Sequence, residues 1–79
     1  MNPYEPISCE FYDELEAYSI MKKEVEIFYE DESGNSVSTF GRIKDLFIRD
    51  KTEYLVLDTG KEIRLDNLIR VDNKLLADY

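Results

Sequence analysis

Residues 37–48 read VSTFGRIKDLFI, and this stretch decides the fold that the sequence predicts. It is an extended, strand-like stretch with Gly41 in its middle. A glycine inside a strand pattern usually marks a bulge or a sharp bend, because it has no side chain to pack against neighbours. We therefore expect residues 37–48 to form a long strand that bends at Gly41, and the sheet around it to be curved.

The segments on both sides of this stretch also have strand patterns. In residues 24–30, apolar Val25, Ile27 and Tyr29 alternate with glutamates, which is typical of a half-buried strand. Residues 53–57 form a nearly continuous apolar run, as expected of a central strand. Two shorter strands are predicted at 62–65 and 68–71, and turns or loops at 31–35, 49–52, 58–61 and 66–67.

A helix is predicted before the first strand, from about Ser8 to about Ile20. Ser8 follows Pro6 and can act as an N-cap, because its hydroxyl can accept a hydrogen bond from a first-turn N–H. The apolar residues of this segment fall three or four apart and therefore share one helix face. They are Ile7, Phe11, Leu15 and Tyr18.

One helix followed by five short, bent strands predicts a mainly β protein that forms a single domain over residues 1–79. A flat sheet of these strands would leave exposed edges and too small a core. Closing the sheet into a small barrel, with the helix across one open end, solves both problems. Sm-like and OB-like folds have this architecture, and the helix-first order favours a small Sm-like five-stranded barrel with an N-terminal α-helix.

The net charge of −8 is unevenly distributed along the chain. Residues 1–32 contain ten acidic and two basic residues, whereas residues 33–79 contain eight of each. On the predicted helix, Cys9, Asp13 and Glu16 cluster opposite the apolar face, with Glu10 beside them and Tyr12 at one border. Such a one-sided acidic face would steer the protein toward a basic partner surface.

Several function classes are disfavoured by composition. The chain has no histidine, one cysteine and three glycines, so we expect no metal site, no cofactor, no Ser-His or Cys-His catalysis and no phosphate-binding loop. We do not expect an enzyme. Direct nucleic-acid binding conflicts with the negative charge, because affinity for phosphates comes largely from Lys and Arg. No run approaches the ~20 apolar residues that span a bilayer, and the reducing cytoplasm fits a single cysteine best.

Two blocks of the sequence form recognisable motifs. The first has the pattern Y-x-P-I-x-C-x-x-Y-D-x-L-E, carried by Tyr4, Pro6, Ile7, Cys9, Tyr12, Asp13, Leu15 and Glu16. The second comprises Arg49, residues 53–56 (EYLV) and residues 64–66 (RLD). Both blocks resemble the Rof (Rho-off) family, also called YaeO. Residues 20–24 and the tail after Val71 do not match the family pattern, and Asp50 stands where the family is often more basic.

The resemblance implies a small Sm-like barrel that inhibits the bacterial transcription termination factor Rho. The inhibitor would dock on the primary RNA-binding site in the N-terminal domains of Rho and keep RNA out. At the positions that match the family, the resemblance implies a contact surface that comprises the acidic helix face and the loop around Arg49. The residues implied are Asp13, Glu16, Cys9, Glu10 and Tyr12 on the helix, and Arg49, Asp50 and Lys51 in the loop.

Two alternatives remain open at this point. An Sm-like or Hfq-like RNA-binding module has the same architecture, but such modules normally display a basic face with aromatic side chains framed by Lys or Arg. We expect no aromatic side chain of this protein to be framed by Lys or Arg, because the basic residues are dispersed along the sequence. An acidic nucleic-acid mimic that blocks another basic protein is the second alternative. The high net charge favours a monomer.

Overall fold

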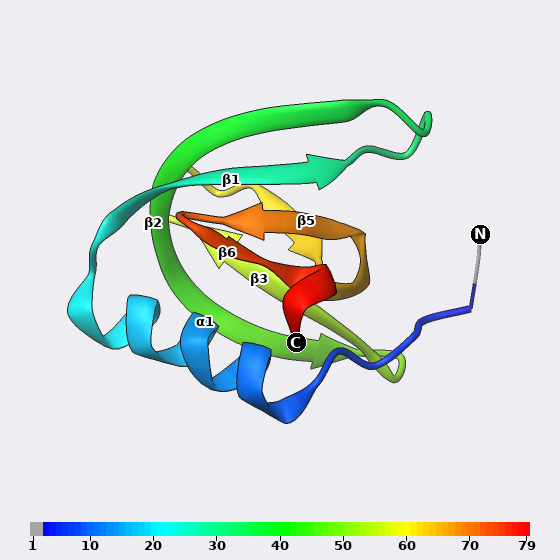
Figure 1. Ribbon diagram of the computed structural model, residues 1–79, viewed down its shortest axis with the longest axis horizontal. Helices are drawn as coiled ribbons and strands as arrows, with labels where there is room; N and C mark the ends of the chain where they lie inside the picture. The colour runs from blue at the N-terminus through cyan, green and yellow to red at the C-terminus, as the bar shows by residue number, and fades with distance from the viewer. Residues whose placement is uncertain (1–2) are drawn as a thin grey trace.

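The structure is a computed structural model that describes residues 3–79. Helix α1 (Cys9–Met21) precedes all the strands, and the chain ends close to it (Figure 1). Two short 3-10 helices, η1 (Leu65–Asn67) and η2 (Leu76–Asp78), lie in the C-terminal third. The strands are β1 (Glu24–Glu30), β2 (Ser36–Arg49), β3 (Thr52–Leu57), β4 (Glu62–Arg64), β5 (Leu68–Val71) and β6 (Lys74–Leu75).

The strands form one antiparallel sheet in the order β4-β3-β2-β1-β5-β6. The prediction of a mainly β protein with an N-terminal helix is therefore confirmed. The predicted five-stranded barrel is not confirmed, because the sheet has a sixth strand and its edge strands β4 and β6 do not pair to close it. Strand β6 has only two residues, paired to β5 through the turn at Asp72 and Asn73, and so short an element leaves no periodic pattern in the sequence.

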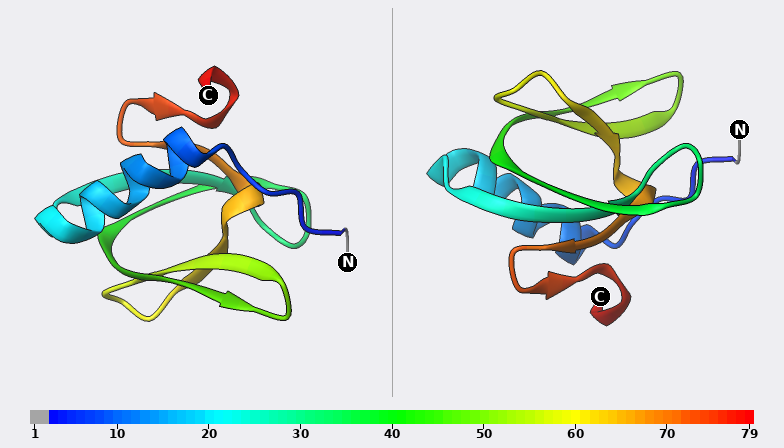
Figure 2. Two further views of the ribbon diagram at one scale, coloured as in Figure 1. Left: turned by 90° about the horizontal axis from the view of Figure 1, so that it is seen from below. Right: turned by 90° about the horizontal axis from the view of Figure 1, so that it is seen from above.

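Strand β2 is the element that curves the sheet. Its first half, through Arg42, pairs with β1, and its second half, from Ile43, pairs with β3. Figures 1 and 2 show β2 sweeping around the molecule between these partners. The predicted bend is present, but the register shift lies between Ile43 and Asp45, not at Gly41.

Gly41 has a different role from the predicted bulge. It is buried, and a Cβ atom placed there would lie 3.1 Å from Asp58 Oδ1 and 3.3 Å from Leu57 Cδ1. Neither neighbour is free to move, because Leu57 is fully buried and Asp58 Oδ1 accepts a hydrogen bond from the backbone N–H of Arg42. Gly41 thus allows the turn after β3 to pack directly against the β2 backbone.

Replacing Gly41 by Ala is therefore expected to lower the free energy of unfolding by about 1–3 kcal/mol, the usual cost of overpacking. The lower backbone entropy of alanine in the unfolded chain offsets about 0.4–1 kcal/mol of this cost. Urea denaturation followed by circular dichroism measures the change. An unchanged or higher midpoint would show that the Asp58 turn yields easily and that this close approach does not constrain residue 41.

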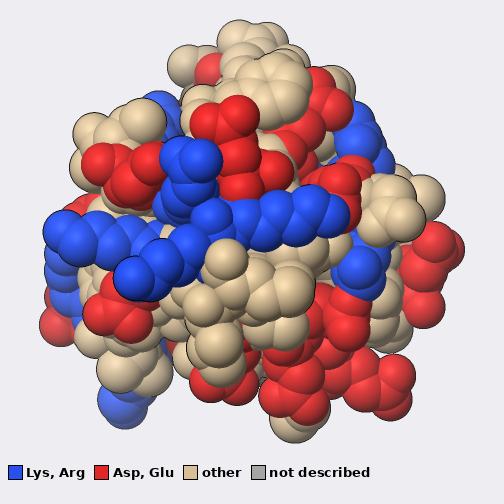
Figure 3. Space-filling model, turned by 90° about the vertical axis from the view of Figure 1, so that its left-hand side faces the viewer, with Lys and Arg blue, Asp and Glu red and all other residues tan. Residues whose placement is uncertain are grey.

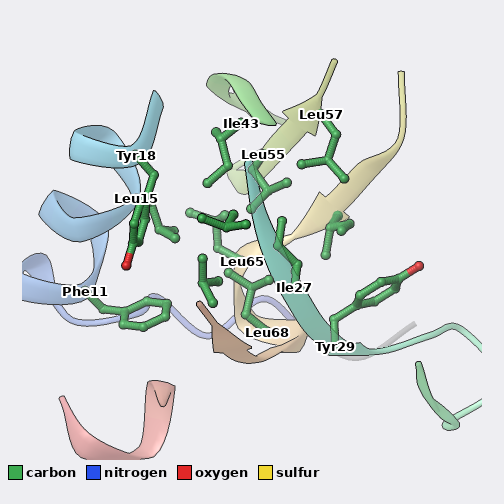
Figure 4. Close-up of a cluster of buried hydrophobic side chains, with 13 residues drawn as sticks. Phe11, Leu15, Tyr18, Ile27, Tyr29, Ile43, Leu55, Leu57, Leu65 and Leu68 are labelled. Carbon is green, nitrogen blue, oxygen red and sulfur yellow. The ribbon is translucent and has the colours of Figure 1, made fainter. Parts of the chain in front are cut away.

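The core lies between α1 and the concave side of the curved sheet (Figure 4). Helix α1 contributes three of the four residues on the predicted apolar face, while Ile7 is half-buried just before the helix. The buried residues are Phe11, Leu15, Tyr18, Val25, Ile27, Tyr29, Ile43, Leu55, Leu57, Ile63, Leu65, Leu68 and Val71.

The ends of α1 are held by local interactions. Ser8 is the N-cap as predicted, and its Oγ accepts a hydrogen bond from the backbone N–H of Phe11 at 3.1 Å. The helix ends at Lys22, which adopts a left-handed conformation with φ 54°. The Arg42 guanidinium donates a hydrogen bond to the Lys22 carbonyl, which joins this end of the helix to β2.

Candidate functional site

Helix α1 presents an acidic face to solvent. Asp13 and Glu16 are exposed and lie on the side of the helix away from the buried Phe11, Leu15 and Tyr18. Glu10 and Cys9 are also exposed, and Cys9 is a free thiol in the first turn. The structure therefore brings together the residues that the helical spacing placed on one face.

A shallow hollow lies next to this face, where the N-terminal segment and the helix meet the β2–β3 hairpin. Tyr12 is half-buried in it, and Glu53 of β3 forms part of the opposite wall. The lining residues are Pro6, Ile7, Cys9, Tyr12, Asp13 and Glu53. The hollow thus combines apolar surface with carboxylates from two separate elements.

The pKa of Tyr12 indicates how the charges are arranged around this hollow. Burial raises the pKa of the Tyr12 hydroxyl, and the carboxylates of Glu53, Glu16 and Asp45 raise it further. Asp45 lies on β2 and Glu53 on β3. The acidic face of the helix therefore continues onto the hairpin, and we call the whole area the acidic surface: Glu10, Asp13, Glu16, Asp45 and Glu53.

Asp45 and Glu53 are site residues that the sequence analysis missed. They lie in the charge-balanced part of the chain, so counting charge along the sequence gives no reason to join them to the helix. A partial signal was present, since Glu53 belongs to the second block of the Rof-like pattern. Tyr4 belongs to the first block, and its hydroxyl donates a hydrogen bond to Glu53 Oε1 at 2.9 Å. Burial and this hydrogen bond raise the pKa of Tyr4 well above its ordinary value.

Ion pairs neutralise much of the remaining acidic charge. Glu14 pairs with Lys74 at 3.2 Å, and Glu26 pairs with Arg70 at 3.0 Å. Arg42 lies between Glu24 and Asp58, at 3.8 and 3.7 Å. Among residues 3–79, none of the ion pairs involves a member of the acidic surface. The acidic surface therefore keeps its negative charge, as does the β1–β2 turn with Glu30, Asp31 and Glu32.

Basic side chains collect at another end of the molecule. Lys22 follows the last turn of α1, and Arg42 and Lys44 lie on the adjacent part of β2, as hydrogen bonds from Arg42 to Lys22 and from Ser19 to Lys44 show. Figure 3 shows Lys and Arg side chains in a band across the middle of this face, with acidic side chains both above and below the band. Along α1 the exposed charged residues thus change from acidic, at Glu10, Asp13 and Glu16, to basic just after the helix, at Lys22 and Lys23.

The predicted loop at 49–52 is a tight hairpin turn. Arg49 and Thr52 pair as strand residues, so only Asp50 and Lys51 form the turn. Both have positive φ, 51° and 63°, as in a two-residue hairpin turn. Asp50 and Lys51 are exposed at the tip, but Arg49 is not a loop residue, which corrects the prediction.

Arg49 lies instead on the outer face of the sheet. Its guanidinium carbon is 5.0 Å from the ring centroid of Phe47 and 5.4 Å from that of Tyr54, and these two rings stack with centroids 5.2 Å apart. Glu62 of β4 fixes the guanidinium through contacts of 3.2 and 3.4 Å. The expectation that no aromatic side chain is framed by Arg is therefore wrong, because antiparallel pairing places Phe47 opposite Tyr54 and Arg49 two residues along the same face.

Within the part of the chain that the structure describes, no group of Cys, Asp and Glu side chains is arranged to hold a metal ion. No helix among the described residues is long and apolar enough to cross a membrane. No protein-family model matches this chain, and no curated protein matches it either.

Proposed function

We propose that this protein inhibits the bacterial transcription termination factor Rho by occupying its primary RNA-binding site. The acidic surface is the observation that carries the proposal. An RNA-binding site must be basic, because affinity for RNA depends on neutralising phosphates. A surface with Asp13 and Glu16 on one side and Glu53 on the other offers such a site carboxylates in place of phosphates.

The resemblance to the Rof family supports the same proposal from the sequence. Its first block contains Tyr12 and Asp13, which line the hollow, Tyr4, which donates a hydrogen bond to Glu53 in its wall, and Glu16, whose charge raises the pKa of Tyr12. We also propose that the curved sheet is a variant of the Sm-like barrel, since a helix precedes strands that run β4-β3-β2-β1-β5 across it. The protein would act as a monomer in the cytoplasm, where Rho binds nascent RNA.

Within the hairpin, the roles we propose for the implied contact residues differ. Asp50 and Lys51 are exposed at the tip and are available to a partner. Arg49 is held by Glu62 against Phe47 and Tyr54, so its part is to stiffen the hairpin that carries Glu53. We therefore assign the main electrostatic contacts to the helix and to Glu53.

RNA binding is a second candidate function, favoured by the stacked rings of Phe47 and Tyr54 beneath Arg49. Aromatic rings next to a guanidinium can stack nucleobases. Six of the ten Lys and Arg residues are already engaged in ion pairs with carboxylates, which leaves little positive charge for a phosphate backbone. The inhibitor function is therefore the better supported of the two.

A competition experiment separates the two functions. A labelled pyrimidine-rich RNA is bound to purified Rho, and fluorescence anisotropy is followed as the protein is added at physiological salt. We expect the anisotropy to fall to that of free RNA, because the acidic surface and RNA compete for one basic site. In the same titration without Rho, the protein alone should not raise the anisotropy.

Two results would contradict the proposal. If Rho-bound RNA keeps its anisotropy at tens of micromolar protein, the protein does not compete for the primary site. If the protein alone raises the RNA anisotropy at submicromolar concentration, it is an RNA-binding module. A purified transcription assay provides an independent measurement, since termination at a Rho-dependent site should fall as the protein is added.

A further inference from the structure

We infer that residues 72–79 form a strap that fixes helix α1 against the sheet, and that loosening this strap releases the helix while the sheet stays folded. The strap comprises Asp72, Asn73, β6, η2 and Tyr79. It lies beside the helix in Figures 1 and 2, although more than 50 residues separate the two along the chain. The inference concerns the helix alone and does not depend on which partner the protein binds.

Asp72 joins the strap to the C-terminal end of the helix. Its Oδ2 accepts hydrogen bonds from the Tyr18 hydroxyl at 3.0 Å and from Lys23 Nζ at 3.3 Å. Its backbone is anchored to the sheet, because its N–H donates to the Glu26 carbonyl at 2.8 Å and its carbonyl accepts from Arg70. Asp72 therefore connects α1 to both β1 and β5.

Lys74 provides a second connection, which reaches one helical turn closer to the N-terminus of α1. Its Nζ donates to the Tyr18 hydroxyl at 2.8 Å and lies 3.2 Å from Glu14 Oε2. The Tyr18 hydroxyl thus accepts from Lys74 while it donates to Asp72. These contacts have the electrostatic effect expected of a connected network, since they lower the pKa of Asp72 and raise that of Lys74.

Tyr79 provides the third connection, at the start of the helix. Its ring meets that of Phe11 edge to face, with centroids 5.1 Å apart. Of the three buried side chains of α1, the strap therefore contacts both the first, Phe11, and the last, Tyr18. Figure 4 shows the Phe11 ring extending from the helix toward the other buried side chains, so the partly exposed Tyr79 ring packs on it from the edge of the core.

The network is well placed to open locally. The side chains of Lys23, Asp72, Lys74 and Glu14 are between 30% and 53% exposed, so water can replace their contacts without unfolding the sheet. Strands β1, β2 and β3, by contrast, are joined by long backbone ladders of seven and six residue pairs. Segments that have few buried contacts and are held by exposed polar interactions open locally, at a lower free energy than global unfolding requires.

Hydrogen exchange resolved by residue tests the inference. Tyr18→Phe keeps the buried ring but removes the hydroxyl that links Asp72 and Lys74, and Lys74→Met removes the cation while keeping much of its stem. For each variant we expect the α1 amides to exchange about ten-fold faster or more, as for a lost hydrogen bond to a charged group. Amides of β1, β2 and β3 should stay within about two-fold of the wild type.

Glu62→Gln is the matched control, because it weakens an ion pair of similar exposure at edge strand β4, outside the contacts of the strap. It should leave the α1 amides unchanged. The inference is overturned if α1 exchange in both strap variants stays at the wild-type rate. It is equally overturned if helix and sheet amides accelerate together, because the strap would then support only global stability.

Discussion

Reversing Asp13 and Glu16 together to Lys is expected to weaken binding to Rho by about 100-fold or more while leaving the melting temperature nearly unchanged. At a basic site the two changes replace attraction with repulsion, and like charges facing each other across an interface cost several kcal/mol. Both side chains are exposed and outside the ion pairs of residues 3–79, so the cost to folding should stay within about 0.5 kcal/mol. Titration calorimetry with purified Rho measures the binding.

The control is Glu30→Lys with Glu32→Lys, which changes the net charge by the same amount. Both residues are exposed at the β1–β2 turn, which Figure 1 places on the other side of the molecule from α1. This pair should weaken binding only slightly, through the general field of the protein. Equal losses in the two double variants, with wild-type circular dichroism for both, would show that α1 is not the contact surface.

Leu55→Ala is expected to have the largest effect on stability. Leu55 is 0% exposed and lies in β3, between strands β2 and β4, where it pairs with Leu46 on β2 and Ile63 on β4. Truncating a buried leucine to alanine costs about 2–5 kcal/mol, through lost burial and the cavity left behind. A core of this size supplies only about 3–5 kcal/mol of net stability. We therefore expect a substantial unfolded fraction at 25 °C, measured by circular dichroism and urea denaturation.

Val56→Ala provides the comparison on the same strand. Val56 follows Leu55 directly, points to the outer face of the sheet and is only partly buried. Its truncation removes less apolar surface and opens no enclosed cavity, so its effect should be clearly smaller. If the two variants lose the same free energy of unfolding, the core does not lie on the inner face of β3 as the structure places it.

The sequence predicted the helical part of the acidic surface but not the part on the β2–β3 hairpin. Helix periodicity alone placed Cys9, Asp13 and Glu16 on one outward face, because side chains three or four apart share a face whatever the rest of the chain does. The contribution of Asp45 and Glu53 could not be foreseen, since it depends on α1 packing beside the β2–β3 hairpin. A sum of charges along the sequence also cannot reveal that Glu14 is neutralised by Lys74, which follows it by 60 residues.

By itself, the sequence determined the local elements of this protein. The apolar spacing and Ser8 specify α1, and the alternation at 24–30 specifies β1, because these signals act within a few residues. Only the tertiary structure decided the open six-stranded sheet and the strap. A two-residue strand and the Tyr18–Asp72–Lys74 network form only when distant segments meet, and no local pattern records such a contact.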